Sequence, residues 1–157
     1  MTGREQINLE KLLTSIDKCR IHLSRIHYAS EQIKELIPLT AERYKVISDA
    51  TIGNIDQLVF RFSKLQDELG NNTFRLLLEF LREDQADKPF RDILNSLERL
   101  RIIDSADSWM ALRELRNDLA HEYPVMIDET IDKINYLFLQ LPLLENILKT
   151  IELQVKV

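Results

Sequence analysis

Apolar side chains recur at alternating intervals of three and four residues along most of the chain, and this spacing constrains the fold more than any other feature. It is the spacing of one face of an α-helix, whereas a half-buried strand alternates apolar and polar residues. In the first segment the repeat consists of Leu9, Leu12, Ile16, Cys19, Leu23, Ile26, the small Ser30, Ile33 and Ile37. This segment is predicted to form one long helix that ends at Pro38.

The same spacing predicts further helices near residues 41–69, 72–81, 90–100, 106–122 and 128–153. The 3 glycines and 4 prolines make only 7 of the 157 residues, against an average share of about 12% for these turn-forming residues. Turns are therefore too few for a many-stranded sandwich or barrel. We expect an all-α fold, an antiparallel up-down helical bundle of five or six helices, in a single domain over residues 1–157.

Capping residues suggest where several of these helices begin and end. Thr40 and Ser105 are expected to cap the helices that follow them, because a hydroxyl can accept a hydrogen bond from the first turn. Gly70 is expected to end the second helix in a left-handed conformation, and Asn72 to cap the next one. Pro142 is expected to kink the last helix, because proline lacks the N–H that the helix interior needs.

Several classes of protein are disfavoured by simple counts. Cys19 is the only cysteine, so neither an intramolecular disulfide nor a cysteine cluster for zinc can form. No apolar leader follows the N-terminus, and the longest uncharged run, residues 134–144, is too short to span a bilayer. We therefore expect a cytoplasmic protein with no membrane partner. The net charge of −5 argues against non-specific binding to duplex DNA.

A second stripe on the first helix is polar and mildly basic, and is predicted to be a solvated face. Its members are Lys11, Ser15, Lys18, His22 and Arg25. His22 and His27 are five residues apart and do not share a helical face, so we interpret both as ordinary surface residues and not as metal ligands.

Ionisable side chains crowd the end of the predicted helix over residues 106–122. On a helical projection Arg116 falls about 40° from Leu112, on the flank of the apolar stripe. One interpretation is structural: the arginine stem packs while its guanidinium pairs with a carboxylate on a neighbouring helix. His121 has a structural interpretation too, because a histidine near a helix C-terminus interacts favourably with the helix dipole.

The order Arg116-x4-His121-x-Tyr123, with Asn117 after the arginine, resembles the R-x4-6-H motif of HEPN domains. The likeness is greatest to the HepT-type subclass, whose motif extends to R-x4-H-x-Y and whose gene lies beside that of a minimal nucleotidyltransferase. The resemblance implies a metal-independent endoribonuclease toxin, without cofactor, that acts on RNA as a homodimer. It also implies that the nucleotidyltransferase silences the toxin by AMPylation of Tyr123.

The chemistry of these side chains suits RNA cleavage, in which the 2′-hydroxyl attacks the adjacent phosphorus. An imidazole, with an ordinary pKa of about 6.5, suits His121 to proton transfer. The guanidinium of Arg116 can stabilise charge on phosphate oxygens, and Asn117 can orient either group. On a straight helix, however, Arg116 and His121 lie about 140° apart. Either the helix unwinds before His121, helped by Pro124, or two protomers share the site.

Two other functions remain open. The chain could be a non-catalytic substrate-binding or scaffolding subunit of a nucleotidyltransferase, or a helical dimerisation module in which Arg116 and His121 are structural. The presence of Arg116, His121 and Tyr123 together favours the ribonuclease, because a scaffold has no use for all three in this order. The acidic net charge weighs mildly against it. A minimal nucleotidyltransferase in the neighbouring reading frame would support the first two hypotheses.

Overall fold

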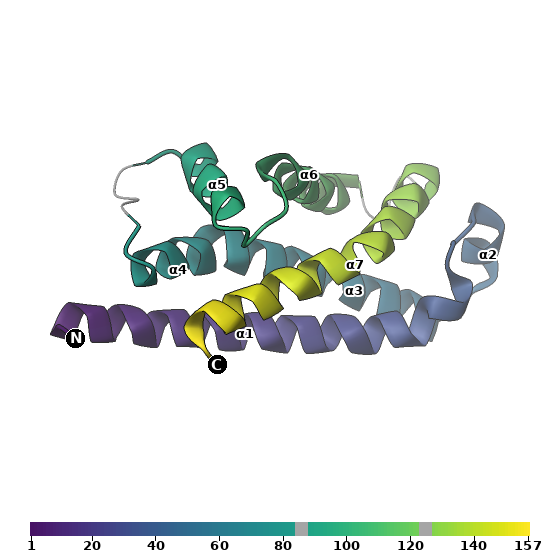
Figure 1. Cartoon of the computed structure of the whole chain (residues 1–157). Coiled ribbons are helices and arrows are strands. Elements are labelled where there is room, and N and C mark those ends of the chain that lie inside the picture. The colour runs from purple at the N-terminus through teal and green to yellow at the C-terminus, as the bar shows by residue number, and fades with distance from the viewer. Residues whose placement is uncertain (84–87, 123–126) are drawn as a thin grey trace.

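The structure, a computed structural model, describes residues 1–83, 88–122 and 127–157 (Figure 1). The described elements are all helical, with no strand among them, which confirms the all-α prediction. They are α1 (Gly3–Ile33), the 3-10 turn η1 (Lys34–Leu36), α2 (Ala41–Val46), α3 (Asp49–Glu68), the π-helical turn η2 (Leu69–Thr73), α4 (Phe74–Phe80), α5 (Phe90–Arg99), α6 (Ala106–Glu122) and α7 (Ile127–Val155).

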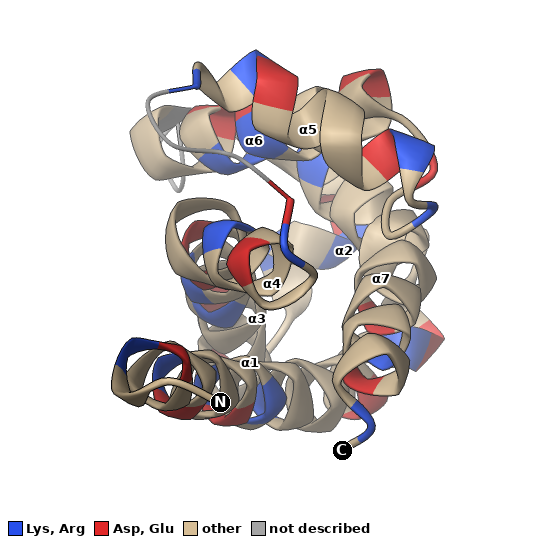
Figure 2. Ribbon diagram, turned by 60° about the vertical axis from the view of Figure 1, so that its left-hand side comes forward, with Lys and Arg blue, Asp and Glu red and all other residues tan. Residues whose placement is uncertain are grey.

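The helices form a bundle in which neighbours run in opposite directions. Helix α1 lies along α3 and α4, which return antiparallel to it (Figure 1). Helix α6 packs on α3 and α5, and α7 closes the bundle against α1 and α6. Viewed closer to the axis of α1, the elements α1, α3–α4, α5–α6 and α7 surround a common interior (Figure 2).

The interior is filled by the apolar stripes that the sequence predicts. On α1, Leu12, Ile16 and Ile26 are fully buried. The largest buried side chains include Trp109 and Phe74, whose ring centres lie 4.6 Å apart in an edge-to-face contact. Each fully buried apolar side chain of this size contributes about 1.5–3 kcal/mol to folding, so these stripes hold the helices together.

The predicted second helix, residues 41–69, is divided into α2 and α3. Thr40 caps α2 as expected, because its hydroxyl accepts a hydrogen bond from the Arg43 N–H at 3.1 Å. Ile47 and Ser48 then adopt extended backbone conformations and break the helix. The Ser48 hydroxyl accepts the Thr51 N–H at 3.2 Å, so a second cap, which the sequence analysis did not identify, starts α3.

The expected helix end at Gly70 and the expected cap at Asn72 are both wrong. The chain stays helical from α3 through η2 into α4, and Gly70 has no left-handed backbone. A Cβ atom on Gly70 would lie 3.3 Å from Cζ2 of Trp109, so the glycine provides close packing in place of a turn. The Asn72 amide donates to the Glu68 carboxylate at 2.9 Å and caps nothing.

Helix α6 contains Arg116, Asn117 and His121, and α7 is the next helix along the chain. Ser105 caps α6 as predicted, accepting the Ser108 N–H at 3.0 Å. Helix α6 remains helical through Glu122, so the first of the two alternatives, a helix that unwinds before His121, is not what the structure shows. Helix α7 begins at Ile127, within one residue of the prediction, and continues through Pro142. Tyr123 and Pro124 lie outside the described residues.

Candidate functional site

Arg116 lies on the inner flank of α6, where it faces α3. Its Nη2 donates to Oδ2 of Asp67 at 3.0 Å, and about a third of each side chain is exposed (31% and 35%). The structural interpretation, an ion pair with a carboxylate of a neighbouring helix, therefore describes its contact correctly. The Nε of Arg116 is buried and has no hydrogen-bond partner among the described residues. Asp67 thus holds only one edge of the guanidinium.

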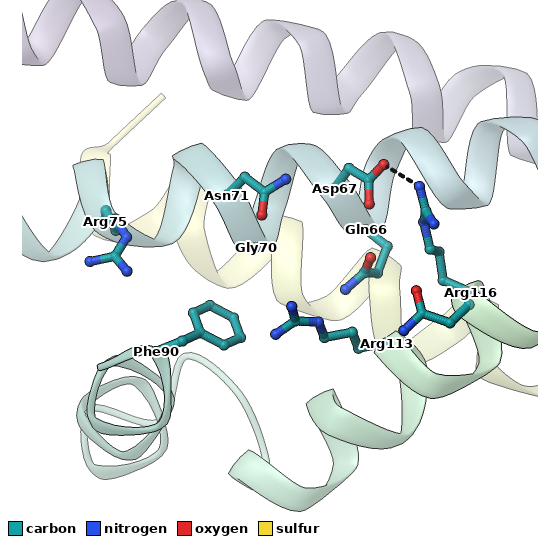
Figure 3. Close-up of a pocket in the computed structure, with 9 residues that line it drawn as sticks. Gln66, Asp67, Gly70, Asn71, Arg75, Phe90, Arg113 and Arg116 are labelled. Atoms are coloured by element: carbon teal, nitrogen blue, oxygen red, sulfur yellow. Dashed lines mark hydrogen bonds and ion pairs between the residues drawn. The ribbon is translucent and has the colours of Figure 1, made fainter. Parts of the chain in front are cut away.

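The same arginine lines a pocket of about 460 Å³ between α3–α4 on one side and α5 and α6 on the other (Figure 3). The lining residues are Gln66, Asp67, Gly70, Asn71, Arg75, Phe90, Arg113, Arg116 and Asn117. Arg113, Arg116 and Asn117 share a face of α6 because they are three and four residues apart. The opposite wall consists of residues of α3, η2 and α4, which follow one another as continuous helix. Gly70 in this wall has no side chain, which leaves room for the ring of Trp109.

The pocket is basic although the chain is acidic. Three guanidinium groups, those of Arg75, Arg113 and Arg116, face one carboxylate, that of Asp67. Within the described parts of the chain, neither Arg75 nor Arg113 has a carboxylate partner. The guanidinium carbon of Arg113 lies 5.2 Å from the centre of the Phe90 ring, which holds this cation over an aromatic face. Unpaired arginines in a concave site suit an anionic ligand.

Gln66 adds a neutral donor and acceptor to this wall. Only 5% of the residue is exposed, and it lines the pocket beside Asp67. No described residue forms a hydrogen bond with its side-chain amide. The amide faces the pocket, where it can exchange hydrogen bonds with water or with a polar ligand.

The motif residues do not all meet in one chain. Asn117 is exposed and lines the pocket beside Arg116. His121 is exposed near the end of α6 and does not line the pocket. Because α6 stays helical through Glu122, the angular separation of Arg116 and His121 on one helix persists. Of the two arrangements that the sequence left open for a catalytic site, this helix does not show the one in which it unwinds before His121.

Some residues of the pocket escape sequence reasoning. Arg113 has a detectable signal, because it lies three residues before Arg116 on the same helical face. Arg75 and Gln66 carry no such signal, since they come from helices whose packing against α6 follows from the tertiary fold. Asp67 could be anticipated only as an unspecified carboxylate on a neighbouring helix.

The other two histidines, His22 and His27, both lie on α1. His22 is half-buried, and its Nδ1 lies 3.1 Å from Nη1 of Arg61, so the expectation of an ordinary surface histidine is wrong for this residue. His27 is exposed, and its Nε2 lies 3.4 Å from Oε2 of Glu145. Among the residues placed by the structure, no group of three or more His, Cys, Asp or Glu side chains is arranged to hold a metal ion.

No family model, curated protein or solved structure matches this chain. The likeness to HEPN domains therefore depends on the motif residues alone. Over the described residues, no helix is long and apolar enough to cross a membrane.

Proposed function

We propose that this protein is a metal-independent endoribonuclease of the HEPN type, resembling the HepT subclass, and that it acts as a homodimer. The observation that carries the proposal is the position of Arg116. The arginine of the R-x4-H-x-Y motif lies on the wall of a pocket that also holds Arg75 and Arg113, so the motif is attached to a site suited to phosphate.

The proposed reaction uses the ribose 2′-hydroxyl of the RNA itself. A base removes the 2′ proton, the 2′-oxygen bonds to the adjacent phosphorus, and the bond from phosphorus to the 5′-oxygen breaks as that oxygen takes a proton. The products are a 2′,3′-cyclic phosphate and a 5′-hydroxyl. Arg116 stabilises charge on the non-bridging oxygens, and His121 transfers a proton. Asn117, next to Arg116 in sequence and one turn before His121, orients the phosphate.

The arrangement of α6 bears on the oligomeric state. His121 is exposed on the outside of α6 and so is available to a second copy of the chain. In the proposed dimer, the His121 of one protomer completes the pocket that contains Arg116 of the other, and a two-fold axis creates two such sites.

Single substitutions test the proposal. In buffer with EDTA, Arg116→Ala and His121→Ala should each lower RNA cleavage by about 10²-fold or more, because each removes a group used in the transition state. Arg25→Ala is the matched control, since Arg25 is an exposed arginine on α1 with no ion pair to a described residue. Thermal melts of all variants should show an intact fold. Equal cleavage by wild type and His121→Ala would contradict the proposal.

We also propose that a minimal nucleotidyltransferase silences the enzyme by AMPylating Tyr123, which lies outside the described residues. The added nucleotide would place negative charge close to the RNA site and repel phosphate. Tyr123→Phe removes the acceptor hydroxyl and no catalytic group, so cleavage should persist while the nucleotidyltransferase no longer silences it. The readout is RNA cleavage after incubation with the partner and ATP. Silencing of Tyr123→Phe to the wild-type extent would exclude this acceptor.

A second candidate function is a non-catalytic substrate-binding subunit of a nucleotidyltransferase. The observation that favours it is that the pocket of one chain is lined by arginines and amides and lacks an imidazole among its described lining residues. Under this hypothesis no variant and no preparation of the wild type cleaves RNA. Arg116→Ala would then weaken only the binding of the ligand or partner.

A further inference from the structure

The pocket extends well beyond the motif residues. Its far part, which we call the Arg75–Arg113 end, is formed by Arg75, Phe90 and Arg113 from α4, α5 and α6, while Gln66 of α3 lies between Arg113 and Arg116 (Figure 3). We propose that this end is a substrate subsite that holds a backbone phosphate of single-stranded RNA, adjacent to the phosphate held at Arg116. The inference rests on the proposed ribonuclease function and names which form of RNA the site takes.

The arginines at this end lack a carboxylate partner among the described residues, so an anionic ligand could pair with them. Asp67 is the carboxylate of the pocket, and it lies 3.0 Å from Arg116. Arg75 and Arg113 have no carboxylate partner within the described residues. Arg113 is exposed, and its guanidinium carbon lies 5.2 Å from the centre of the Phe90 ring, a contact that favours this position of the cation. A phosphate bound at this end would supply the missing counter-charge.

The spacing of the arginines fits successive phosphates of one strand. Arg113 and Arg116 are three residues apart on α6, which places their Cβ atoms about 5–6 Å from one another on one face. Each guanidinium can therefore engage a different phosphate of the same strand. In this arrangement Arg113 sets the register of the strand, while Arg116 acts on the phosphate that is cleaved.

Gln66 explains why the strand must be single. Only 5% of the Gln66 residue is exposed, its side chain lines the pocket, and its amide has no hydrogen-bond partner among the described residues. A nucleotide that enters the pocket can offer a ribose hydroxyl or a base edge to this amide only if it leaves the stacked, paired helix. Paired nucleotides in an RNA duplex cannot enter a concave site of about 460 Å³ in this way.

Binding measurements on a cleavage-deficient protein test the inference. The probe is a short fluorescent oligouridine, with an RNA duplex of the same length for comparison, and anisotropy gives Kd at two salt concentrations in EDTA. In the His121→Ala background, Arg113→Gln and Arg75→Gln should each raise Kd for the single strand by about tenfold. Each should also lower the slope of log Kd against log salt by about one. Arg25→Gln makes the same change of charge on α1, and it should change neither Kd nor the salt slope by a comparable amount.

The outcomes separate this inference from the proposed function. If Arg75→Gln and Arg113→Gln bind like Arg25→Gln while cleavage still requires Arg116 and His121, the subsite is excluded and the ribonuclease remains. If binding depends on Arg75 and Arg113 but the protein with an intact motif never cleaves, the ribonuclease is excluded and the subsite remains. Equal affinity for duplex and single strand would overturn the inference.

Discussion

His22 is surrounded by cations and partly withdrawn from water. Burial of the imidazole and the positive charge of Arg61 lower the pKa of His22 below its ordinary value, and Lys64 and Lys18 act in the same direction. Glu68 opposes them by raising the pKa of His22. The neutral ring lies with Nδ1 at 3.1 Å from Nη1 of Arg61, where it can accept a hydrogen bond. Protonation would remove that acceptor and add a like charge.

The pH dependence of stability should report this environment. Because the pKa of His22 is lowered in the folded state, its contribution is complete above the unfolded value of about 6.5 and is lost as pH falls below it. Urea midpoints should therefore decline from pH 7.5 to pH 5.5 more steeply for wild type than for His22→Gln. His27→Gln, on the same helix, leaves His22 in place and should keep the steeper decline. Parallel curves for wild type and His22→Gln would contradict the assignment.

Single residues also show what the sequence could and could not predict about burial. The apolar stripe of α1 was predictable, because Leu12 and Ile16 have no favourable alternative to the core. Ser15 was assigned to a solvated stripe, yet only 3% of it is exposed. Its hydroxyl donates to Oε2 of Glu68 at 2.8 Å and lies 2.7 Å from Oγ1 of Thr73. Both partners come from more than fifty positions away, so no local pattern marks this contact.

At the scale of elements, local signals failed where tertiary packing overrode them. Gly70 and Asn72 together are typical of a helix end, but the chain passes through both in η2. The Thr73 hydroxyl donates to the Glu68 carbonyl oxygen at 3.2 Å inside this turn, and Trp109 of α6 packs directly over Gly70. A π-helical turn is held by such contacts between helices, which a sequence pattern within one helix cannot contain.

Two glycine substitutions separate helix propensity from packing. Gly53→Ala, in α3, has nothing within 4 Å of the new Cβ and should stabilise the protein by about 0.5–1 kcal/mol. Gly70→Ala gains the same propensity, but its Cβ would lie 3.3 Å from Cζ2 of Trp109. Trp109 is 1% exposed and packs edge-to-face on Phe74, so it has little room to shift and the net effect should be destabilising.

The measurement is urea unfolding followed by the fluorescence of Trp109, the single tryptophan of the chain. Gly70→Ala should unfold at lower urea than wild type, and Gly53→Ala at higher urea. Stabilisation of Gly70→Ala equal to that of Gly53→Ala would show that the contact with Trp109 relaxes without cost, and that η2 does not require the glycine.

At the scale of the whole molecule, one chain brings Arg116 and Asn117 to a pocket but does not bring His121 there. Arg116 and Asn117 line one pocket, because both belong to one helix whose phase the apolar stripe fixes. Arg75 and Phe90 reach the same pocket from other helices, and that convergence follows from the bundle as a whole. His121 is on α6 too, but the helix does not bend it toward Arg116. If His121 takes part in the proposed site, a second chain has to supply it.

Mixing two inactive variants tests that shared site. In a homodimer whose sites each combine Arg116 of one protomer with His121 of the other, a heterodimer of Arg116→Ala and His121→Ala contains one intact site and one site that lacks both groups. Random exchange of equal amounts makes about half of all dimers heterodimers, so cleavage should recover to about a quarter of the wild-type rate.

Each variant alone should stay near background. Wild type mixed with the double variant provides the control for subunit exchange. If both residues acted within one protomer, no intact site could form in the mixture, and cleavage would stay at background however completely the subunits exchange.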